Sequence, residues 1–383
     1  MLSNPFVTEA HETLRMRVRE FAEREIKPLA ADLDETETFS LELTAKMGDM
    51  GFFGIQVPKE LGGQNLDTLS YIIIVEELAR VDSSQAATVA AVNSLAIAPI
   101  MKYGTEEQKR RFIPPLSTGK MTWAFGLTEE KAGSDAMGTE TTATLENGFW
   151  LINGTKTHIT NSASSISGGV TLQAVTGQKN GRKQLSAIIV ERGTPGFTTE
   201  PSKQKMMWRA SDTGKLFFKD CKVPAGNLLG EEGYGGRIML NTLDAGRLSI
   251  AAIGLGLALG AMEASLEYSK ERVQFAKPIS KFQAVGFKLA DMDVKTELAR
   301  NTLYNACWRK DNNMQFAREA AISKLYASEI AREIADEAVQ IHGAKGLFKP
   351  HPVERFYRDQ RLLQIGEGTS EILRLVISRY LGV

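Results

Sequence analysis

The 383-residue sequence predicts an α+β multidomain fold in which an all-β segment separates two helical segments. Apolar residues recur at three- and four-residue spacing from Thr8 to about Tyr103 and again from about Gly235 onward, as in amphipathic helices. Between Met121 and Gly230 the pattern changes to β-forming runs separated by turn residues. The expected domains are 1–120 (α-helical), 121–232 (β) and 233–383 (a helical bundle).

The first helical segment is predicted to contain helices near residues 8–29, 67–80 and 83–101. The third of these is rich in alanine and nearly uncharged, so we expect it to be buried. Gly62-Gly63 predicts a loop before the second helix. The apolar stripe of the first helix comprises Leu14, Val18, Phe21, Ala22, Ile26 and Leu29.

In the middle segment, Asn147-Gly148 lies between two β-forming runs, and this dipeptide is a strong signal for a tight β-hairpin. A continuous apolar run at residues 185–190 predicts a buried strand. Residues 215–219 predict another strand, which we expect to end at Asp220. We therefore expect β-sheet structure between the helical regions.

The last segment predicts three long helices separated by short breaks, which favours an antiparallel bundle. They cover residues 238–273, 282–311 and 315–342. The run Gly254–Gly260 resembles a nucleotide-binding glycine fingerprint, but its spacing is too long and no strand precedes it. We expect its small residues to permit close packing of helices instead.

The composition argues against several classes of protein. The 46 basic and 46 acidic residues cancel, so we expect no whole-chain attraction to nucleic acid or to an anionic membrane. Cys221 and Cys307 do not make a disulfide framework and indicate a reducing compartment. The four histidines lie too far apart for a local metal motif, and we expect no metal. We find neither a signal peptide nor an apolar run long enough to cross a membrane, so we expect a soluble protein.

One acidic residue near the C-terminus, Glu367, lies between Gly366 and Gly368 and follows a mostly apolar run. Glycines let the backbone approach a ligand closely. An apolar setting raises the pKa of a carboxyl group, which suits a general base. The alternative interpretation is a helix-start cap with an exposed acid. The local sequence leaves both interpretations open.

Five short segments, in their order along the chain, resemble the motifs of a known family. They are Phe125–Asp135, Gly154–Asn161, Asp244–Arg247, Arg272–Ile279 followed by Gln283, and Gln340–Gly346. Through these segments the chain resembles the acyl-CoA dehydrogenase family from about Thr8 to Val383. The resemblance implies a β-barrel-like middle domain, a C-terminal four-helix bundle, an FAD cofactor and an acyl-CoA substrate.

The resemblance also implies roles for single residues. Thr128 and Thr160 would bond the flavin ring, and Ser134 would lie where flavin and acyl-CoA meet. His158 stands where the family usually has tryptophan, and Arg272 would reach the FAD of a neighbouring subunit. The implied cofactor-binding residues are Phe125, Leu127, Thr128, Ser134, His158, Ile159, Thr160, Arg272, Phe275, Gln283, Gln340, Gly343, Thr369 and Glu371. The implied substrate-binding residues are Ser134, Asp244, Arg247, Gly366 and Gly368.

In the reaction that the resemblance implies, Glu367 removes the α-proton of the acyl thioester while the β-hydride passes to flavin N5, giving a 2,3-enoyl-CoA. Some branches of the family carry the catalytic Glu at the position of Gly246, which leaves Glu367 as the implied base. Asp244 and Arg247 are expected at the start of a long helix, whose dipole would favour the anionic CoA. Gly366 replaces a common tyrosine, so we expect a branched, cyclic or aryl-bearing acyl group unless another side chain refills the space.

Three alternatives remain open from the sequence: an enoyl-CoA reductase, an acyl-CoA oxidase, and a non-catalytic protein that binds acyl-CoA or flavin. The zero net charge and the intact Glu367 favour an enzyme over a binding or scaffold protein. The resemblance further implies an electron-transfer flavoprotein as electron acceptor. It also implies a homotetramer built as a dimer of dimers, in the bacterial cytoplasm.

Overall fold

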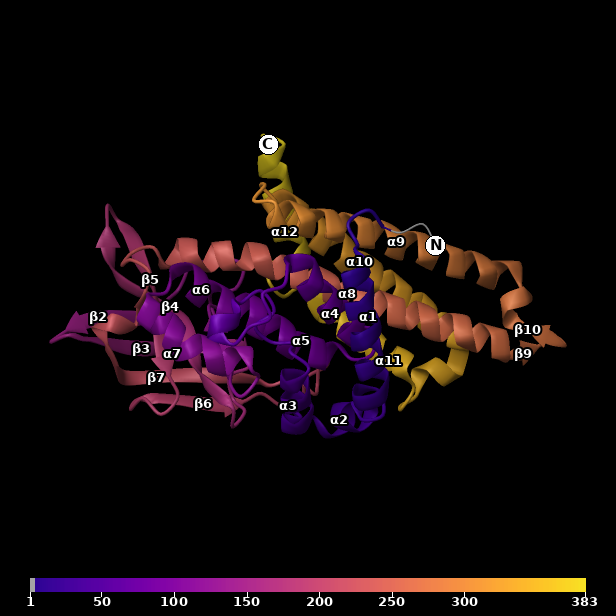
Figure 1. The fold of residues 1–383 in the computed structure, drawn as a ribbon, viewed down its shortest axis with the longest axis horizontal. Coiled ribbons are helices and arrows are strands. Elements are labelled where there is room, and N and C mark those ends of the chain that lie inside the picture. Colours follow the sequence, from indigo (N-terminus) through magenta and orange to yellow (C-terminus); the bar gives the residue numbers. More distant parts are fainter. Residues whose placement is uncertain (1–3) are drawn as a thin grey trace.

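The computed structural model describes residues 4–383. Figure 1 shows the strands of a sheet gathered at one end of an elongated molecule, with the long helices α8, α9 and α10 running toward the other end. A short hairpin of β9 and β10 forms that far end. The bounds are Gly235–Glu271 (α8), Gln283–Asp311 (α9), Ala317–His342 (α10), Val273–Gln274 (β9) and Lys277–Pro278 (β10).

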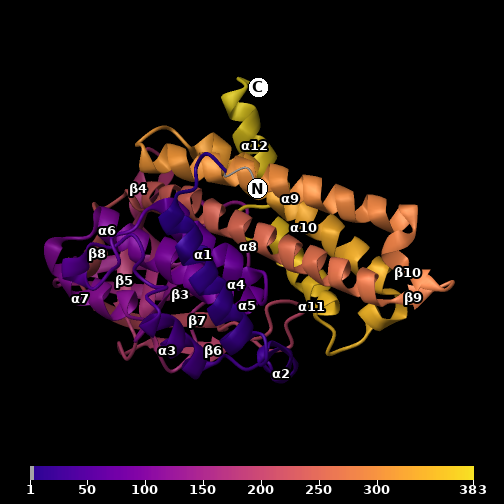
Figure 2. The same cartoon turned by 45° about the vertical axis from the view of Figure 1, so that its right-hand side comes forward.

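The N-terminal helices pack against α8 beside the sheet (Figures 1 and 2). Five of them begin at side-chain caps; at two of these, the Thr8 hydroxyl accepts the N–H of His11 and the Asp67 carboxylate accepts the N–H of Ser70. The helices are α1 (Glu9–Phe21), α2 (Ala30–Thr36), α3 (Leu41–Asp49), α4 (Thr68–Ala79), α5 (Ser83–Ala91), α6 (Ala98–Tyr103) and α7 (Glu106–Ser117).

The helices predicted at 67–80 and 83–101 are confirmed as α4 and as α5 with α6, and the second region is largely buried. A π-helical turn, Val92–Ile97, joins α5 to α6. The helix predicted at 8–29 is α1 extended by a second π-helical turn. Its apolar stripe is buried as expected except for Leu29, which is 40% exposed.

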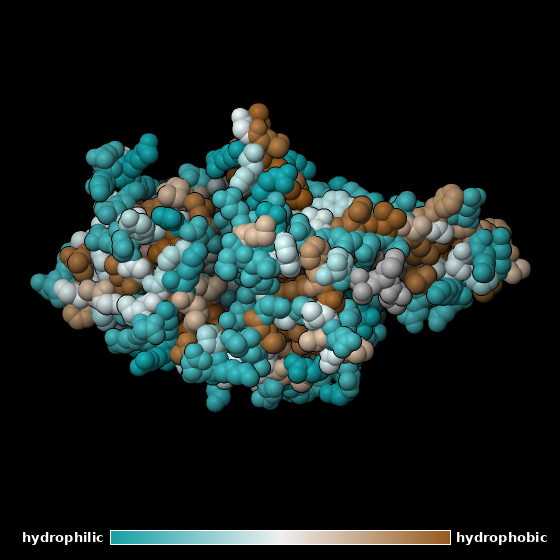
Figure 3. Space-filling view, turned by 45° about the horizontal axis from the view of Figure 1, so that its top comes forward, coloured by the Kyte–Doolittle hydropathy of each residue, from teal (hydrophilic) through white to brown (hydrophobic). Residues whose placement is uncertain are grey.

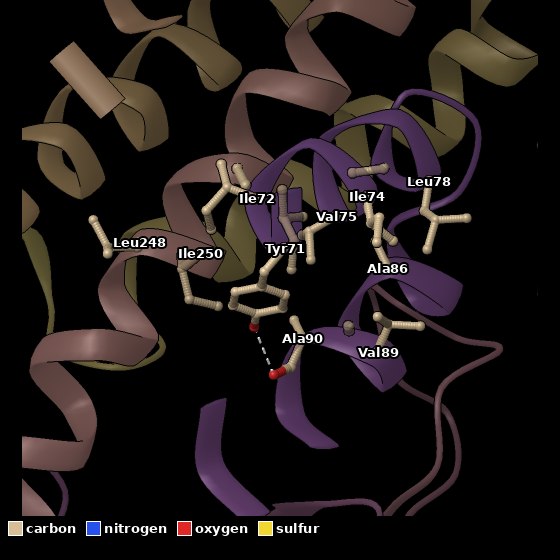
Figure 4. Packing of buried hydrophobic residues seen from close by; sticks show 14 of the residues in the cluster. Tyr71, Ile72, Ile74, Val75, Leu78, Ala86, Val89, Ala90, Leu248 and Ile250 are labelled. Carbon is tan, nitrogen blue, oxygen red and sulfur yellow. Dashed lines mark hydrogen bonds between the residues drawn. The ribbon is translucent and has the colours of Figure 1, made fainter. Parts of the chain in front are cut away.

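Tyr71 ties α4 to α5 in the core. Its hydroxyl donates a hydrogen bond of 2.9 Å to the carbonyl of Ala90, among aliphatic side chains of both helices (Figure 4). Leu248 and Ile250 of α8 lie beside the same cluster. Protein interiors are packed as densely as organic crystals, so α4, α5 and α8 form a rigid support for the neighbouring parts of the fold.

The sheet of the middle region has the strand order β6-β7-β3-β2-β4-β5-β8, and β1 pairs in parallel with β4. Its inner faces bury a separate apolar cluster that includes Trp150, Leu172 and Phe218. The strands are β1 (Thr122–Gly126), β2 (Thr142–Glu146), β3 (Phe149–Thr160), β4 (Ser167–Lys179), β5 (Arg182–Glu191), β6 (Phe197–Pro201), β7 (Thr213–Pro224) and β8 (Leu228–Leu229).

The predicted hairpin and the predicted strand at 185–190 are confirmed as β2–β3 and β5. Both turn residues, Asn147 and Gly148, have positive φ angles of 50° and 81°, as a tight two-residue turn requires. The expected strand end at Asp220 is wrong. This residue has a φ of 48° at a bulge, and β7 continues through it to Pro224.

Small residues of α8 let three helices approach closely, as the sequence predicts. A Cβ atom on Gly256 would collide with the carbonyl of Glu76 in α4. One on Gly260 would collide with the carbonyl of Arg80, just after α4, and Gly254 faces the backbone of Ala327 in α10. The glycine run therefore serves helix packing.

The predicted start of the long helix is wrong. The helix α8 begins at Gly235, so Asp244 and Arg247 lie between two and four turns inside it. Gly235 and Gly236 look like loop residues in the sequence because glycine weakens helices. The helix dipole was expected to favour an anionic ligand at Asp244 and Arg247. That expectation is wrong, because the effect is confined to the first turn of a helix.

Two helical regions are long and apolar enough to cross a membrane, Ser83–Tyr103 and Gly235–Glu271, although the sequence analysis expected none. The protein buries 78% and 83% of their most apolar windows, as it does for core helices. Within residues 4–383, no group of three or more His, Cys, Asp or Glu side chains is placed to hold a metal ion.

The last helix, α12 (Ser370–Tyr380), projects from the bundle in both ribbon views (Figures 1 and 2). Apolar residues are exposed where it ends, and Leu381 and Val383 are 66% and 87% exposed. Figure 3 shows hydrophobic surface on this projection and toward the far end of the bundle. The hairpin at that far end carries Phe275, which is 89% exposed.

Candidate active site

A cavity of about 600 Å³ opens where the N-terminal helices, the sheet and the C-terminal bundle meet. Its walls are mostly apolar, with a few hydroxyl, imidazole and charged groups. Such a cavity is the usual form of a small-molecule site. The sequence-predicted site residues that line it are Phe125, Leu127, Thr128, Ser134, His158, Ile159, Thr160, Arg247, Gly366, Glu367, Gly368 and Thr369.

Glu367 enters the cavity from the turn before α12. Its backbone has a left-handed φ of 52°, and the next residue, Gly368, has a φ of 98°. The cap of α12 is Thr369, whose hydroxyl accepts the N–H of Ile372 at 3.3 Å. The interpretation of Glu367 as the helix cap is therefore wrong, and its carboxylate is free for another purpose.

The Glu367 carboxylate fits against the bare backbone of α8. Its Oε2 atom is buried and has no hydrogen-bond partner within residues 4–383. A Cβ atom on Gly246 would collide with that oxygen. Desolvation by burial raises the pKa of Glu367 to about 7, although the positive charges of Lys324 and Arg247 act in the opposite direction. A carboxyl group with a pKa near neutrality can accept a proton at physiological pH.

Arg247 is almost fully buried and forms an ion pair with Asp244, one turn earlier on α8. Arg247 lines the cavity, whereas Asp244 does not. Burial raises the pKa of Asp244, and the guanidinium of Arg247 acts against this rise. Asp244 therefore acts on the cavity only through Arg247.

A buried ion pair joins β3 to the segment that follows β1. The Lys156 ammonium contacts Glu129 Oε1 at 2.7 Å and donates to the carbonyl of Leu127 at 3.2 Å. The Thr157 N–H donates to the carbonyl of Thr128 at 2.9 Å. Sequence reasoning missed this pair, because each partner lies in a different motif and only the fold brings them together.

His158 lies at an irregularity in the pairing of β3 with β7. Its φ is 59°, which is rare for a residue with a side chain and occurs mostly at functional or strained positions. Its exposed imidazole and the side chains of Ile159 and Thr160 line the cavity. The bulge thus turns a titratable ring toward the ligand space.

Sequence reasoning also missed a group of cavity residues from the loop between β6 and β7. Lys205 donates to the Ser211 hydroxyl at 2.9 Å, and burial lowers the pKa of this lysine to about 8. Trp208 is buried, and its backbone N–H donates to the Asp359 carboxylate at 2.7 Å. This loop belongs to none of the five motifs. The missed lining residues are Ser202, Lys205, Met207, Trp208, Ser211 and Thr213.

Seven predicted site residues do not line the cavity, and five of them, including Gln283 at the start of α9, share the far end of the bundle. Arg272 follows α8, Gln340 and Gly343 lie at the end of α10, and stacking of Tyr268 on His342 at 4.4 Å joins these two helix ends. The hairpin residue Phe275 projects there into solvent. The residues outside the cavity are Asp244, Arg272, Phe275, Gln283, Gln340, Gly343 and Glu371.

The cavity suits a flat heteroaromatic ring with polar edges. Aromatic and aliphatic side chains, including Phe125 and Leu127, supply flat apolar walls. The hydroxyls of Thr128, Ser134 and Thr160 offer hydrogen bonds at several points of the same wall. A flavin ring has these properties, and its binding needs no charged group on its faces.

Fold and cavity together define a three-domain flavoenzyme, with helical first and last domains and a central sheet domain. Family models bear this out: the N-terminal, middle and C-terminal domain models of acyl-CoA dehydrogenase match residues 8–120, 124–221 and 233–382. The chain belongs to the acyl-CoA dehydrogenase family. It is an FAD-dependent enzyme that acts on CH–CH bonds.

Curated relatives match over nearly the whole chain. A probable acyl-CoA dehydrogenase of Bacillus subtilis is 46% identical over 98% of both chains. The short-chain specific acyl-CoA dehydrogenase of Clostridium acetobutylicum is 44% identical over 97% of this chain and 98% of the relative. Among solved structures, butyryl-CoA dehydrogenase of Megasphaera elsdenii superposes with a TM-score of 0.95 at 40% identity, covering 98% and 99% of the two chains.

Two further matches bear on electron flow. The NADH-dependent acryloyl-CoA reductase of Anaerotignum propionicum is 42% identical over 97% of this chain and 94% of the relative. A chain in a solved structure that concerns the electron transferring flavoprotein of Acidaminococcus fermentans is 42% identical to this chain. The two superpose with a TM-score of 0.95, covering 98% of both chains. Members of one family thus differ in the direction in which they pass electrons.

Proposed function

We propose that Glu367 is the base that removes the α-proton of an acyl-CoA thioester as the chain forms a 2,3-enoyl-CoA. One observation carries the proposal: Glu367 lines the family's cofactor cavity, its Oε2 atom is buried without a hydrogen-bond partner within residues 4–383, and burial raises its pKa to about 7. A base is most effective when its pKa lies near the working pH.

The surrounding residues suit two separate tasks, binding of the flavin ring and binding of the thioester carbonyl. Phe125, Thr128, Ser134 and Thr160 would hold the flavin ring of FAD, which would supply an acceptor for the β-hydrogen as hydride. Within residues 4–383 the backbone N–H of Glu367 has no acceptor, so it is free to donate to the thioester carbonyl. Donation to that oxygen stabilises the negative charge that develops when the α-proton leaves.

Glu367→Gln tests the assignment, because an amide cannot accept the α-proton but keeps the shape of the side chain. We expect turnover of butyryl-CoA with an artificial electron acceptor to fall by roughly 10²- to 10⁴-fold, the usual worth of a general base. The flavin absorbance of the purified protein should be unchanged. The same substitution at an exposed hairpin position, Glu146→Gln, should leave turnover intact. Near-wild-type turnover of Glu367→Gln would exclude this role.

We also propose that the acyl group is branched or cyclic. The nearest atoms to a Cβ on Gly366 would be the side chain and the carbonyl oxygen of Leu362, at ordinary contact distances of 3.5 to 3.7 Å, so space remains beside Glu367. Leu362 fills part of that space. Turnover on butyryl-, isobutyryl- and cyclohexanecarbonyl-CoA measures the preference, and a clear preference for the straight chain would exclude the proposal.

Enoyl-CoA reduction is the second candidate function, favoured by the similarity to an NADH-dependent acryloyl-CoA reductase. We propose the oxidative direction with an electron-transfer flavoprotein as acceptor. Anaerobic addition of acyl-CoA should bleach the flavin, and an electron-transfer flavoprotein should restore its colour. Rapid reoxidation by air alone would indicate an oxidase, and NADH-dependent loss of enoyl-CoA would indicate the reductase.

We further propose a homotetramer, a dimer of dimers, in the bacterial cytoplasm. The outer face of α9 carries three large apolar side chains that are more than half exposed, which is unusual for a bundle helix. They are Phe287 (60%), Val294 (57%) and Leu298 (53%). The projecting α12 and the β9–β10 hairpin supply further surface for contacts. Light scattering of the purified protein gives the assembly mass, and a monomer would contradict the proposal.

A further inference from the structure

Lys324 is a fully buried lysine on α10, directed at the turn that carries Glu367. Its ammonium donates a hydrogen bond of 2.7 Å to the carbonyl of Gly368. Burying an ammonium group is costly unless it is paired or hydrogen-bonded. Neither the five sequence motifs nor the cavity lining includes this residue.

The hydrogen bond from Lys324 holds the turn at Glu367 and Gly368 in an unfavourable backbone conformation. Glu367 and Gly368 have left-handed φ angles of 52° and 98°, and a glutamate in this region costs of order 1–3 kcal/mol. Such a conformation persists only where neighbours over-determine it. On the same helix, Ser328 donates to the carbonyl of Leu363 at 2.9 Å, and Glu329 accepts from Gln364 and Ser370 at 2.7 and 2.8 Å, so α10 holds this segment at several points.

Charge is the second link between Lys324 and Glu367. The charged and titratable groups that act on Glu367 come from three helices: Lys324 on α10, Arg247 on α8 and Tyr71 on α4. Arg247 is already paired with Asp244. Burial lowers the pKa of Lys324 to about 8, while Glu367 and the more distant Glu329 and Glu371 act to raise it. Lys324 is therefore largely charged at neutral pH.

We propose that Lys324 is a positioning residue for the base: its ammonium fixes the turn at Gly368 and its charge stabilises the ionised form of Glu367. The inference rests on the proposed role of Glu367. It makes two separable predictions, because the hydrogen bond acts on geometry and the charge acts on the protonation of the base.

Lys324→Met removes both effects and keeps the volume. We expect turnover at neutral pH to fall at least tenfold with FAD still bound. The acid limb of the kcat profile should move to higher pH by about one pH unit, since loss of a neighbouring positive charge favours the neutral carboxyl. Activity should therefore recover in part as the pH is raised.

Two further variants separate the effects. Lys324→Gln keeps a hydrogen-bond donor but removes the charge, so it should show the same shift of the acid limb with a smaller loss at high pH. Ser328→Ala removes another contact of α10 with this segment without changing charge, and its acid limb should stay where it is in the wild type. These comparisons are read from pH profiles, which a merely structural role would not move.

The proposal is overturned if both Lys324 variants bind FAD and keep the wild-type acid limb. It is also overturned if Ser328→Ala shifts that limb as far as the lysine variants do. A Glu367→Gln protein that stays active would instead refute the base assignment itself. Loss of activity in Glu367→Gln together with unshifted profiles in the lysine variants would refute only the role of Lys324.

Discussion

At the scale of single residues, Glu367 and Gly246 act as a steric pair. The Glu367 carboxylate occupies space that exists only because Gly246 has no side chain. The same contact explains how one cavity could hold a carboxylate from either of two positions, on α8 or on the turn before α12. A side chain at Gly246 and the present placement of Glu367 exclude each other.

Gly246→Ala tests this pair. The added methyl group would overlap Glu367 Oε2 and push the carboxylate away from its place, while the cavity-lining residues on β1 and β3 remain untouched. Because small displacements of a catalytic group can cost about 100-fold in rate, we expect a fall in kcat of that order with FAD content unchanged. Wild-type kcat would show that the turn adjusts freely and that the observed placement is not required.

At the scale of secondary-structure elements, local signals predicted much of the fold. Thr8 and Asp67 cap their helices, and Asn147-Gly148 makes the hairpin, because caps and tight turns depend on neighbouring residues alone. The start of α8 and the extent of β7 could not be predicted in the same way. Tertiary packing holds two glycines in a helix at Gly235 and carries a strand through the bulge at Asp220.

The packing of α8 on its neighbours gives a stability prediction. In Gly260→Ala, the new methyl group would meet the backbone carbonyl of Arg80, which cannot rotate away as a side chain does. Overpacking of this kind typically costs about 1–3 kcal/mol, so the free energy of unfolding should fall by that amount. The matched variant Gly286→Ala on α9 meets no atom within 4 Å among the described residues, so helix propensity should leave it equal or more stable. Equal stability of both variants in urea unfolding would contradict the packing argument.

At the scale of the whole molecule, the predicted site divides into two parts. The cavity residues, including Glu367, could be predicted from the family resemblance, and the fold brings them together. Residues whose partners lie far along the chain, such as Lys156 and Lys324, carried no signal in a single sequence, because their hydrogen bonds exist only in the folded chain. Arg272 and Phe275 lie at the opposite end of the bundle, so in the proposed assembly they would reach the cofactor of a second chain.

Mixed oligomers test whether one chain completes the site of another. Glu367→Gln leaves the hairpin intact, and Arg272→Ala leaves the base intact, so each variant alone should be nearly inactive. Co-expression should restore activity to roughly one quarter of the wild type, because half of randomly formed dimers are mixed and each has one complete site. Activity that only averages the two parent variants would show that Arg272 serves its own chain or no cofactor.

The central claim is that Glu367 is the base, and its pKa makes the claim directly measurable. A raised pKa means that the carboxyl group is protonated, and therefore inactive as a base, at pH values below about 7. The rate of anaerobic flavin reduction by acyl-CoA in a single turnover should thus rise as the pH passes upward through about 7. In Glu367→Gln the same rate should be slower by roughly 10²- to 10⁴-fold and lack this rise. An unchanged pH profile in Glu367→Gln, at a rate close to the wild type, would contradict the account.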